Sequence, residues 1–445
     1  MTESFDLVVL GGTCVRSDGR ERADVGIRGG LIAALGDLRF AAAALRIDAE
    51  GLHLLPGVVD TQVHFREPGL THKEDLASGS AAAVLGGVTS VFEMPNTKPP
   101  TTTAAALSDK LERARGRMHC DHAFYVGATP DNAAGLGALE RLPGCCGVKV
   151  FMGSSTGELL VPDDDGVEVV LRSTTRRVTF HAEDEERLRE RRSLAAAGRP
   201  ETHPLWRDPE TARRATARLL TMARKRGRRV HVLHVTTAEE MDLLAANRDL
   251  ASVEVTPQHL TLVAPDCYER LKALAQMNPP IRDANQQAAL WAAVRSGIVD
   301  VVGSDHAPHT LEEKAREYPD TPSGMTGVQT LLPLLLDHAH KGRLALERVV
   351  DLTSTGPARL FGIAGKGRIA RGYDADFTVV DLNARKTITN EWSASRCGWT
   401  PYDGMEAKGW PVATFIRGTM VMCDNALLAP GTGEPVKFVE TLAHA

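Results

Sequence analysis

The sequence predicts an α/β protein in which a (β/α)8 TIM-like barrel carries a small β-sandwich domain built from both ends of the chain. Three observations support this fold class. Short β-branched apolar runs recur through the middle of the 445 residues, alternating with helix-like stretches. Most of these runs end at a polar residue whose side chain can bind a metal ion or take part in catalysis. Buried parallel strands read as continuous apolar runs, and barrels of this type place their chemistry at the carboxyl ends of the strands.

The barrel elements follow one another in regular order. The eight expected strands are Leu54–Val59, Val88–Met94, Ala123–Val126, Gly147–Val150, Val178–Phe180, Val230–Leu233, Val253–Val255 and Val299–Val302. Helical stretches lie between several of them, and the clearest are Lys73–Leu85, Thr103–Arg115, Pro209–Arg226, Ala238–Ala246 and Ala284–Ser296. This alternation is typical of a strand–helix barrel.

The two ends of the chain have a different pattern of short alternating strands and glycine turns. Phe5–Leu10 and Ala23–Arg28 are examples near the start, and Ala413–Arg417 is one near the end. We expect these ends to pair into one small β domain. The predicted division is therefore 1–52 and 363–445 for the β domain, and 53–362 for the barrel.

Composition restricts the class of protein. Hydrophobic residues make up 43% and charged residues 24%, as is ordinary for a soluble globular protein, and the net charge is −5. The small, dispersed charge gives no reason to expect nucleic acid or an anionic membrane as a partner. No apolar stretch approaches the ~20 residues that span a bilayer. The start of the chain does not resemble a signal peptide, and none of the seven cysteines lies in a Cys-x-x-Cys pair, so we expect a cytoplasmic protein with reduced thiols.

The first barrel run leads into the most informative segment, Asp60–Gly69. Alternate residues of a strand point to the same side, so Gln62, His64 and Arg66 are expected to converge on one pocket. His64 is a candidate metal ligand and Arg66 a candidate clamp for a substrate carboxylate. The alternative for Arg66 is an ion pair with a nearby glutamate, Glu67 or Glu93.

Four further strand ends carry candidate ligands: Lys149, His181, His234 and Asp305. A lysine in a central barrel strand can extend only toward the mouth of the barrel, where burial disfavours its charge. A neutral lysine amine can capture carbon dioxide as a carbamate, which binds metal as a carboxylate does. Together with imidazole and carboxylate ligands, this set suits zinc or a similar divalent ion.

The motifs resemble those of the amidohydrolase superfamily and, within it, the dihydroorotases of the long class. The resemblance covers essentially the whole chain. Its main segments are Asp60–Gly69, Phe92–Thr97, Gly147–Met152, Val232–Thr236, Val255–Leu260, Met277–Arg282, Gly303–His309 and Pro322–Gly327. Related allantoinases and dihydropyrimidinases share the metal ligands but lack the His-Phe-Arg-Glu-Pro-Gly run that contains Arg66.

The resemblance implies cyclisation of N-carbamoyl-L-aspartate to L-dihydroorotate in pyrimidine biosynthesis, with zinc as cofactor. Lys149, carboxylated by carbon dioxide, would bridge two ions. His181 and His234 would bind one ion, and His64 and Asp305 the other, with Asp305 also the general acid and base. The implied substrate residues are Arg66 and Asn96 for the carboxylate, Arg282 and His309 for the ring and carboxylate, and the backbone around Asn278 and Gly324 for the ring amide.

Gln62 departs from the family pattern, because many members have histidine there. Three outcomes are open: one metal ion only, two ions with Gln62 or water filling the gap, or a non-catalytic partner of aspartate transcarbamoylase. An allantoinase or hydantoinase type of cyclic amidase is a further alternative. We also expect a homodimer or a larger homo-oligomer.

Other residues give weaker expectations. Gly153–Gly157 is small and polar, and two interpretations are open: a lid over the substrate, or an ordinary turn between a strand and a helix. His259 and His306 lie within the motifs and are expected to orient ligands. Five histidines have no motif around them and are expected at the surface: His119, His122, His203, His338 and His340.

Overall fold

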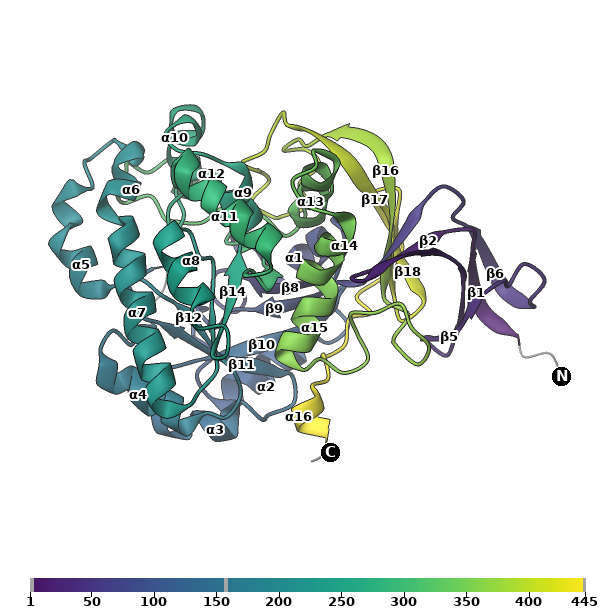
Figure 1. The fold of residues 1–445 in the computed structure, drawn as a ribbon, viewed down its shortest axis with the longest axis horizontal. Coiled ribbons are helices and arrows are strands. Elements are labelled where there is room, and N and C mark those ends of the chain that lie inside the picture. The colour runs from purple at the N-terminus through teal and green to yellow at the C-terminus, as the bar shows by residue number, and fades with distance from the viewer. Residues whose placement is uncertain (1–3, 156–158, 443–445) are drawn as a thin grey trace.

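The computed structural model describes residues 4–155 and 159–442. The chain forms a barrel surrounded by helices, with a β domain beside it (Figure 1). In Figure 1 the purple N-terminal strands and the yellow-green C-terminal strands lie together in the β domain, away from the teal helices of the barrel. Both ends of the chain thus contribute to this domain, as the sequence predicts.

The barrel sheet contains eight strands in sequential order, and every adjacent pair is parallel. They are β8 (Val58–Val63), β9 (Val88–Glu93), β10 (Asp121–Gly127), β11 (Cys145–Phe151), β12 (Val178–His181), β13 (Val230–Val232), β14 (Ala251–Val255) and β15 (Val301–Val302). The first and last strands approach each other just beyond β15, where the His64 amide donates to the His306 carbonyl at 2.7 Å. The predicted barrel is therefore confirmed.

The first predicted strand, Leu54–Val59, is divided between two sheets. Its first part lies in β7 (His53–Pro56), which pairs antiparallel with β16 (Phe377–Thr387) of the β domain. Its second part begins β8 of the barrel. Gly57 separates the two, and a side chain there would collide with Thr89 and Asp376. The apolar run is continuous in sequence, but long-range pairing assigns its halves to different domains.

Local signals explain where the long helices begin and end. Helix α7 (Pro209–Arg226) starts at Asp208, whose side chain accepts the Thr211 amide, and stops at Gly227, which has a φ of 61°. Proline at the first helical position and glycine in a left-handed C-cap are the residues that these positions favour. Capping thus fixes the boundaries that the sequence predicts.

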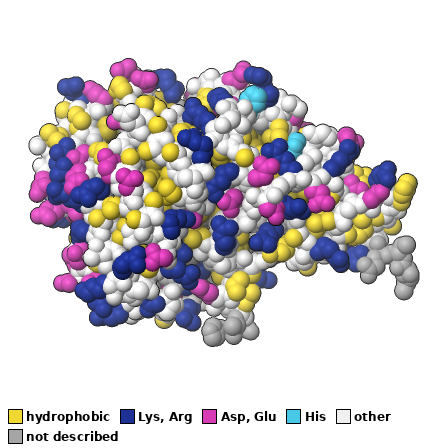
Figure 2. All heavy atoms as spheres, viewed as in Figure 1, with side chains coloured by type: hydrophobic (Ala, Val, Ile, Leu, Met, Phe, Trp, Pro, Cys, Tyr) yellow, Lys and Arg dark blue, Asp and Glu magenta, His cyan; other side chains and the backbone are white. Residues whose placement is uncertain are grey.

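The other helices of the barrel region vary in length. The longer ones are α1 (Leu76–Leu85), α2 (Ala104–Ala114), α4 (Asp164–Ser173), α8 (Ala238–Ala245), α11 (Ala284–Ser296) and α13 (Leu331–His340). Shorter ones are α3 (Leu136–Leu139), α5 (Glu185–Glu190), α6 (His203–Trp206), α9 (Pro257–Thr261), α10 (Asp266–Leu271), α12 (Leu311–Lys314), α14 (Leu346–Val350), α15 (Gly356–Phe361) and α16 (Val439–Leu442). Within the described ranges, no helix combines the length and apolar character needed to cross a bilayer. Acidic and basic side chains are interspersed over the face shown in Figure 2.

The β domain is a sandwich of two sheets. The smaller sheet has the order β5-β4-β1-β6 and the larger one β19-β18-β17-β16-β7-β2-β3. The remaining strands are β1 (Phe5–Leu10), β2 (Thr13–Arg16), β3 (Gly19–Arg22), β4 (Asp24–Arg28), β5 (Leu31–Gly36), β6 (Ala43–Asp48), β17 (Glu406–Ile416), β18 (Thr419–Cys423) and β19 (Ala426–Leu427). Leu7 and Ile27 of the smaller sheet share an apolar core with Phe377 and Phe415 of the larger one. Apolar burial between sheets from both ends of the chain holds the domain together.

Candidate active site

A cavity with an empty volume of about 360 Å³ lies at the carboxyl ends of the barrel strands. All the expected metal ligands line it, as do four of the expected substrate residues. The lining consists of Gln62, His64, Arg66, Asn96, Lys149, Phe151, Ser155, His181, His234, Asn278, Asp305, Ala307, Ser323 and Gly324. Residues separated by more than 260 positions in the sequence thus meet at one point of the fold.

The backbone at this cavity adopts unusual conformations. Arg66, His234 and Asp305 have φ values of 64°, 36° and 45°. Non-glycine residues rarely occupy this left-handed region, and such strain clusters at functional sites. Each of the three follows a barrel strand, so the strain occurs where the chain leaves the sheet and turns its side chain into the cavity.

His181 and His234 face each other. His181 Nδ1 lies 2.9 Å from His234 Nε2, and His181 Nε2 lies 2.9 Å from Glu183 Oε2. Because a carboxylate only accepts, the ring proton of His181 is on Nε2 and the Nδ1 lone pair points toward His234. Burial lowers the pKa of both rings, which favours the neutral form that binds metal. His234 Nδ1 is buried and has no hydrogen-bond partner.

Glu183 supports this pair through His181 and was not predicted from the sequence. Arg207 donates to Glu183 through Nε at 3.1 Å, and both side chains are buried. Burial alone would raise the pKa of Glu183, but Arg207 and His181 together hold it well below its usual range. A carboxylate that fixes the tautomer and orientation of a histidine is a common support for a metal ligand. The signal in the sequence was its position two residues after His181.

Lys149 is the buried lysine of the cavity. Its side chain on β11 is 1% exposed, and its Nζ lies 4.5 Å from the ring centre of Phe151. Burial lowers the pKa of Lys149 to about 7, despite the opposing charges of Asp305 and Glu254. A substantial fraction of the amine is therefore neutral near pH 7, which is the form that reacts with carbon dioxide.

His64, Asp305 and Gln62 form the other side of the centre. His64 Nδ1 donates to Asn96 Oδ1 at 2.8 Å, and His64 Nε2 lies 3.2 Å from Asp305 Oδ1. The Gln62 amide nitrogen donates to the same Asp305 oxygen at 2.9 Å. Its amide oxygen, Oε1, is buried without a partner. Gln62 thus occupies, as a hydrogen-bond donor, a position beside the two candidate ligands.

These residues fit a divalent metal ion. Two ligands each about 2.0–2.1 Å from a zinc ion are about 3 Å apart, which matches the separations within the His181–His234 and His64–Asp305 pairs. Among the residues that the structure describes, no three histidine, cysteine, aspartate or glutamate side chains group closely enough to hold an ion unaided. A carbamate on Lys149 would add the missing oxygen ligands.

Arg66 is a buried cation in the cavity wall. Its guanidinium is 1% exposed, donates through Nε to the Pro308 carbonyl at 3.2 Å, and has Nη2 3.3 Å from His309 Nε2. Burial lowers the pKa of Arg66 to about 10, which leaves it charged at neutral pH. The alternative partners are engaged elsewhere, because Glu67 pairs with Arg117 and Glu93 with Lys110. Arg66 forms no ion pair with a carboxylate of the described residues.

Two expected substrate residues lie behind the cavity wall. Arg282 donates through Nε to the Thr236 hydroxyl at 3.3 Å and through Nη1 to the Arg207 carbonyl, while its Nη2 is buried and unpartnered. His309 contacts the Ser323 carbonyl through Nε2 at 3.1 Å. His309 therefore contacts the lining residue Ser323, and Arg282 contacts Arg207, which supports Glu183, but neither side chain lines the cavity.

The remaining histidines differ from expectation in several places. His122, His203 and His338 are buried, so their predicted surface placement was wrong. His203 Nε2 lies 2.9 Å from Asn278 Oδ1, which connects it to the cavity lining. His259 contacts the Thr256 hydroxyl at 2.7 Å and the Pro279 carbonyl at 3.0 Å, so it fixes the loop that carries Asn278.

The segment expected to form a lid is only partly described. Ser155 lines the cavity and its hydroxyl accepts from the Asn278 amide at 3.4 Å. Thr156 and Gly157 lie outside the described residues. The neighbouring Ser154 is anchored by Glu185, whose carboxylate accepts both its amide and its hydroxyl.

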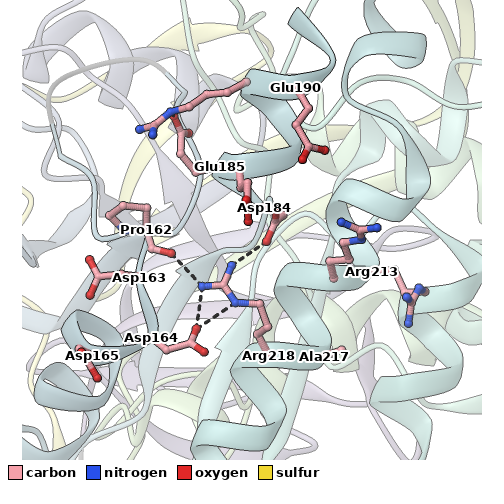
Figure 3. A pocket seen from close by; sticks show the side chains of 13 residues that line it. Pro162, Asp163, Asp164, Asp165, Asp184, Glu185, Glu190, Arg213, Ala217 and Arg218 are labelled. Carbon is pink, nitrogen blue, oxygen red and sulfur yellow. Dashed lines mark hydrogen bonds and ion pairs between the residues drawn. The ribbon is translucent and has the colours of Figure 1, made fainter.

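A wider, open cleft lies between α4, α5 and α7 (Figure 3). Several of its charged side chains pair with one another. Arg218, for example, donates to Asp164 at 2.9 Å and to Asp184 at 2.6 Å. The strand-end cavity combines buried polar atoms that have no partner with strained backbone, and is therefore the better candidate for chemistry.

Comparisons with known proteins identify the family of the chain. A model described as "Amidohydrolase family" matches residues 53–421. A dihydroorotase of Halobacterium salinarum is 39% identical over 419 residues, which cover 92% of this chain and 94% of that protein. An allantoinase of Rubrobacter xylanophilus is 36% identical over 456 residues, covering 98% of both chains. The solved structure of an L-hydantoinase from Arthrobacter aurescens superposes with a TM-score of 0.92 at 31% identity, covering 97% of this chain and 99% of that one.

Proposed function

The chain belongs to the amidohydrolase family, and we propose that it is a metal-dependent dihydroorotase, which interconverts N-carbamoyl-L-aspartate and L-dihydroorotate. The family supports a hydrolase acting on cyclic amides. Sequence identity alone does not select the substrate, because the dihydroorotase and allantoinase relatives are similarly distant. The choice therefore depends on the residues of the cavity.

The observation that carries the proposal is the unpaired guanidinium of Arg66 in the cavity wall. A buried cation without a carboxylate partner is costly, so it favours a ligand that brings its own negative charge. Dihydroorotate has a ring carboxylate, whereas hydantoin and allantoin do not. Asn96 lines the same cavity as Arg66, and we assign both residues to the substrate carboxylate.

The metal would be held by the five side chains already described. We assign His181, His234 and the Lys149 carbamate to one zinc ion, and His64 and Asp305, with the same carbamate, to a second. When bound, zinc lowers the pKa of water and polarises the amide carbonyl. The hydrogen bond from Gln62 to Asp305 competes with the second ion. The protein holds two ions if binding of the second ion to Asp305 is stronger than this hydrogen bond, and one ion if it is weaker.

Asp305 is the proton carrier in this proposal. In hydrolysis its carboxylate takes a proton from the attacking water and delivers it to the departing ring nitrogen, and the N–C bond of the cyclic amide breaks. In the biosynthetic direction the terminal nitrogen of the carbamoyl group attacks the carbon of the side-chain carboxyl group of carbamoyl aspartate. The N–C bond forms, and water leaves. Asn278 and Gly324 line the same cavity, and we assign their backbone groups to the ring amide.

The test is a substrate panel with the zinc-loaded protein. Dihydroorotate hydrolysis at alkaline pH and carbamoyl aspartate cyclisation at acidic pH are expected, with little turnover of hydantoin or allantoin. Turnover of hydantoin or allantoin alone would instead assign a different cyclic amidase. Inactivity on every substrate, together with tight binding to aspartate transcarbamoylase, would identify a non-catalytic partner.

A further inference from the structure

A second group of charged residues lies directly behind Arg66. Lys73 Nζ is 3.0 Å from Glu313 Oε1 and 3.1 Å from His309 Nδ1. Lys73 precedes α1 and Glu313 lies in α12, so the group joins two segments that are 240 positions apart. We call Lys73, His309 and Glu313 the Lys73 cluster. Neither Lys73 nor Glu313 lines the cavity, and the mechanism above uses neither.

Lys73 fixes the protonation of the His309 ring. An ammonium group can only donate, so His309 Nδ1 must accept from it. Burial holds the pKa of His309 well below its usual range, and the ring is therefore neutral. Its single proton is then on Nε2, which lies 3.1 Å from the Ser323 carbonyl and 3.3 Å from Arg66 Nη2. The N–H groups of His309 and Arg66 are thus adjacent.

Lys73 also neutralises Glu313, the carboxylate of the cluster. The two side chains are only 11% and 15% exposed, so solvent screens their charges weakly. Glu313 has three further contacts, with the Thr310 amide at 3.2 Å, with His72 at 3.3 Å and with the neutral His309 at 3.7 Å. The His72 side chain is 57% exposed, which makes it a weak counter-charge. Without Lys73, the negative charge of Glu313 would act on Arg66, with which it already interacts electrostatically.

We propose that Lys73 determines specificity for an anionic ring: by neutralising Glu313 and fixing the tautomer of His309, it keeps the positive charge of Arg66 available for the substrate carboxylate. This inference rests on the proposed function, because it requires a substrate that carries a carboxylate. Arg66 would contact the substrate, whereas Lys73 acts through Arg66 and His309 and is a positioning residue.

The experiment compares an anionic ligand with its neutral counterpart. The KM for dihydroorotate is measured together with the inhibition constant of dihydrouracil, which lacks only the carboxylate. Lys73→Met should raise the KM for dihydroorotate by about tenfold or more, the size expected for one uncompensated charge near a buried site. The inhibition constant of dihydrouracil should change much less. Lys73→Arg keeps the charge and should remain close to wild type.

Charge rescue separates this role from a structural one. Lys73→Met combined with Glu313→Gln restores the net charge of the cluster and should recover most of the lost affinity for dihydroorotate. Glu313→Gln alone should leave that KM unchanged or lower it, which gives a second test if Lys73→Met fails to fold. Lys437→Met, at an exposed lysine of the C-terminal segment, changes the net charge equally and serves as the matched control.

Equal losses for dihydroorotate and dihydrouracil in Lys73→Met would overturn the inference, as would a double variant no better than the single one. A higher KM in Glu313→Gln would overturn it as well. Failure of the proposed function looks different, because the wild-type protein would then not act on dihydroorotate at all. Only a wild type active on dihydroorotate, with variants that break the expected order, refutes the role of Lys73 alone.

Discussion

Replacing Gln62 by histidine should increase the metal content of the protein. In the structure, the Gln62 amide donates to Asp305 at 2.9 Å, beside His64, and its oxygen has no partner. Gln62 therefore occupies Oδ1 of Asp305, a candidate ligand, with a hydrogen bond, and supplies no strong metal ligand itself. Histidine at this position would remove the competing donor and add an imidazole, which is a good zinc ligand.

The magnitude follows from the lost hydrogen bond. A hydrogen bond to a charged acceptor contributes about 1.5–3 kcal/mol, and each 1.4 kcal/mol corresponds to a factor of ten in binding. An ion bound by His64 and Asp305 must overcome that contribution in the wild type. The dissociation constant for this ion should therefore fall by at least about tenfold in Gln62→His, before the gain from the new ligand is counted.

Elemental analysis after equilibration at defined free zinc concentrations measures how much zinc each protein binds. Gln62→His should hold more zinc per chain than the wild type at the same free concentration, and Gln62→Ala should fall between them. Gln258→His is the matched control, because Gln258 is also a buried glutamine near Asp305 but donates to the Ser304 carbonyl. Equal zinc content in Gln62→His and the wild type would show that Gln62 does not compete with the metal ion for Asp305.

Of three further predictions, two concern residues near the cavity, and the third concerns Glu240 in helix α8. Glu183→Gln should weaken zinc binding about 10- to 100-fold, because the charge that orients His181 is lost; chelator competition measures it, and unchanged affinity would contradict it. Lys314→Met should lower the unfolding temperature and raise the KM, since Lys314 donates to the carbonyls of Gln276, Pro322 and Gly324, of which Gly324 lines the cavity; Lys437→Met should do neither. Glu240→Gln tests a buried carboxyl whose pKa burial raises to about 7. A raised acid pKa stabilises the fold at low pH, and this contribution declines between about pH 4.5 and pH 7, so wild-type stability should fall by up to about 1.4 kcal/mol per pH unit there relative to the variant. Parallel urea-unfolding stabilities of the two proteins over that range would contradict the last prediction.

Much of the fold could be predicted because buried parallel strands leave a local signal. The limits of α7 were readable from Pro209 at its start and Gly227 after its end, where local capping decides the structure. The first strand was misplaced because Leu54–Val59 is one apolar run in the sequence. Its division depends on pairing with β16, more than 300 residues away, which no local pattern records.

In the candidate site, too, features set by local sequence could be predicted, and features set by contacts between distant residues could not. The candidate ligands could be predicted to meet because each lies at a strand end, and barrel geometry brings strand ends together in one cavity. The supporting contacts were not found, since Arg207 reaches Glu183 from a loop and Lys73 reaches Glu313 across 240 positions. His203 was expected at the surface because nothing in its local sequence indicates burial, yet it packs beside Asn278. Pairwise contacts between distant polar residues depend on the completed fold.

The most direct test of the proposed metal centre and of the proposed anionic substrate is a crystal structure of the zinc-loaded protein with dihydroorotate. Zinc should be bound by His181, His234 and a carboxylated Lys149, with the substrate carboxylate on the guanidinium of Arg66. Zinc bound elsewhere, an unmodified Lys149 turned away from His181, or a substrate carboxylate directed away from Arg66 would contradict this prediction.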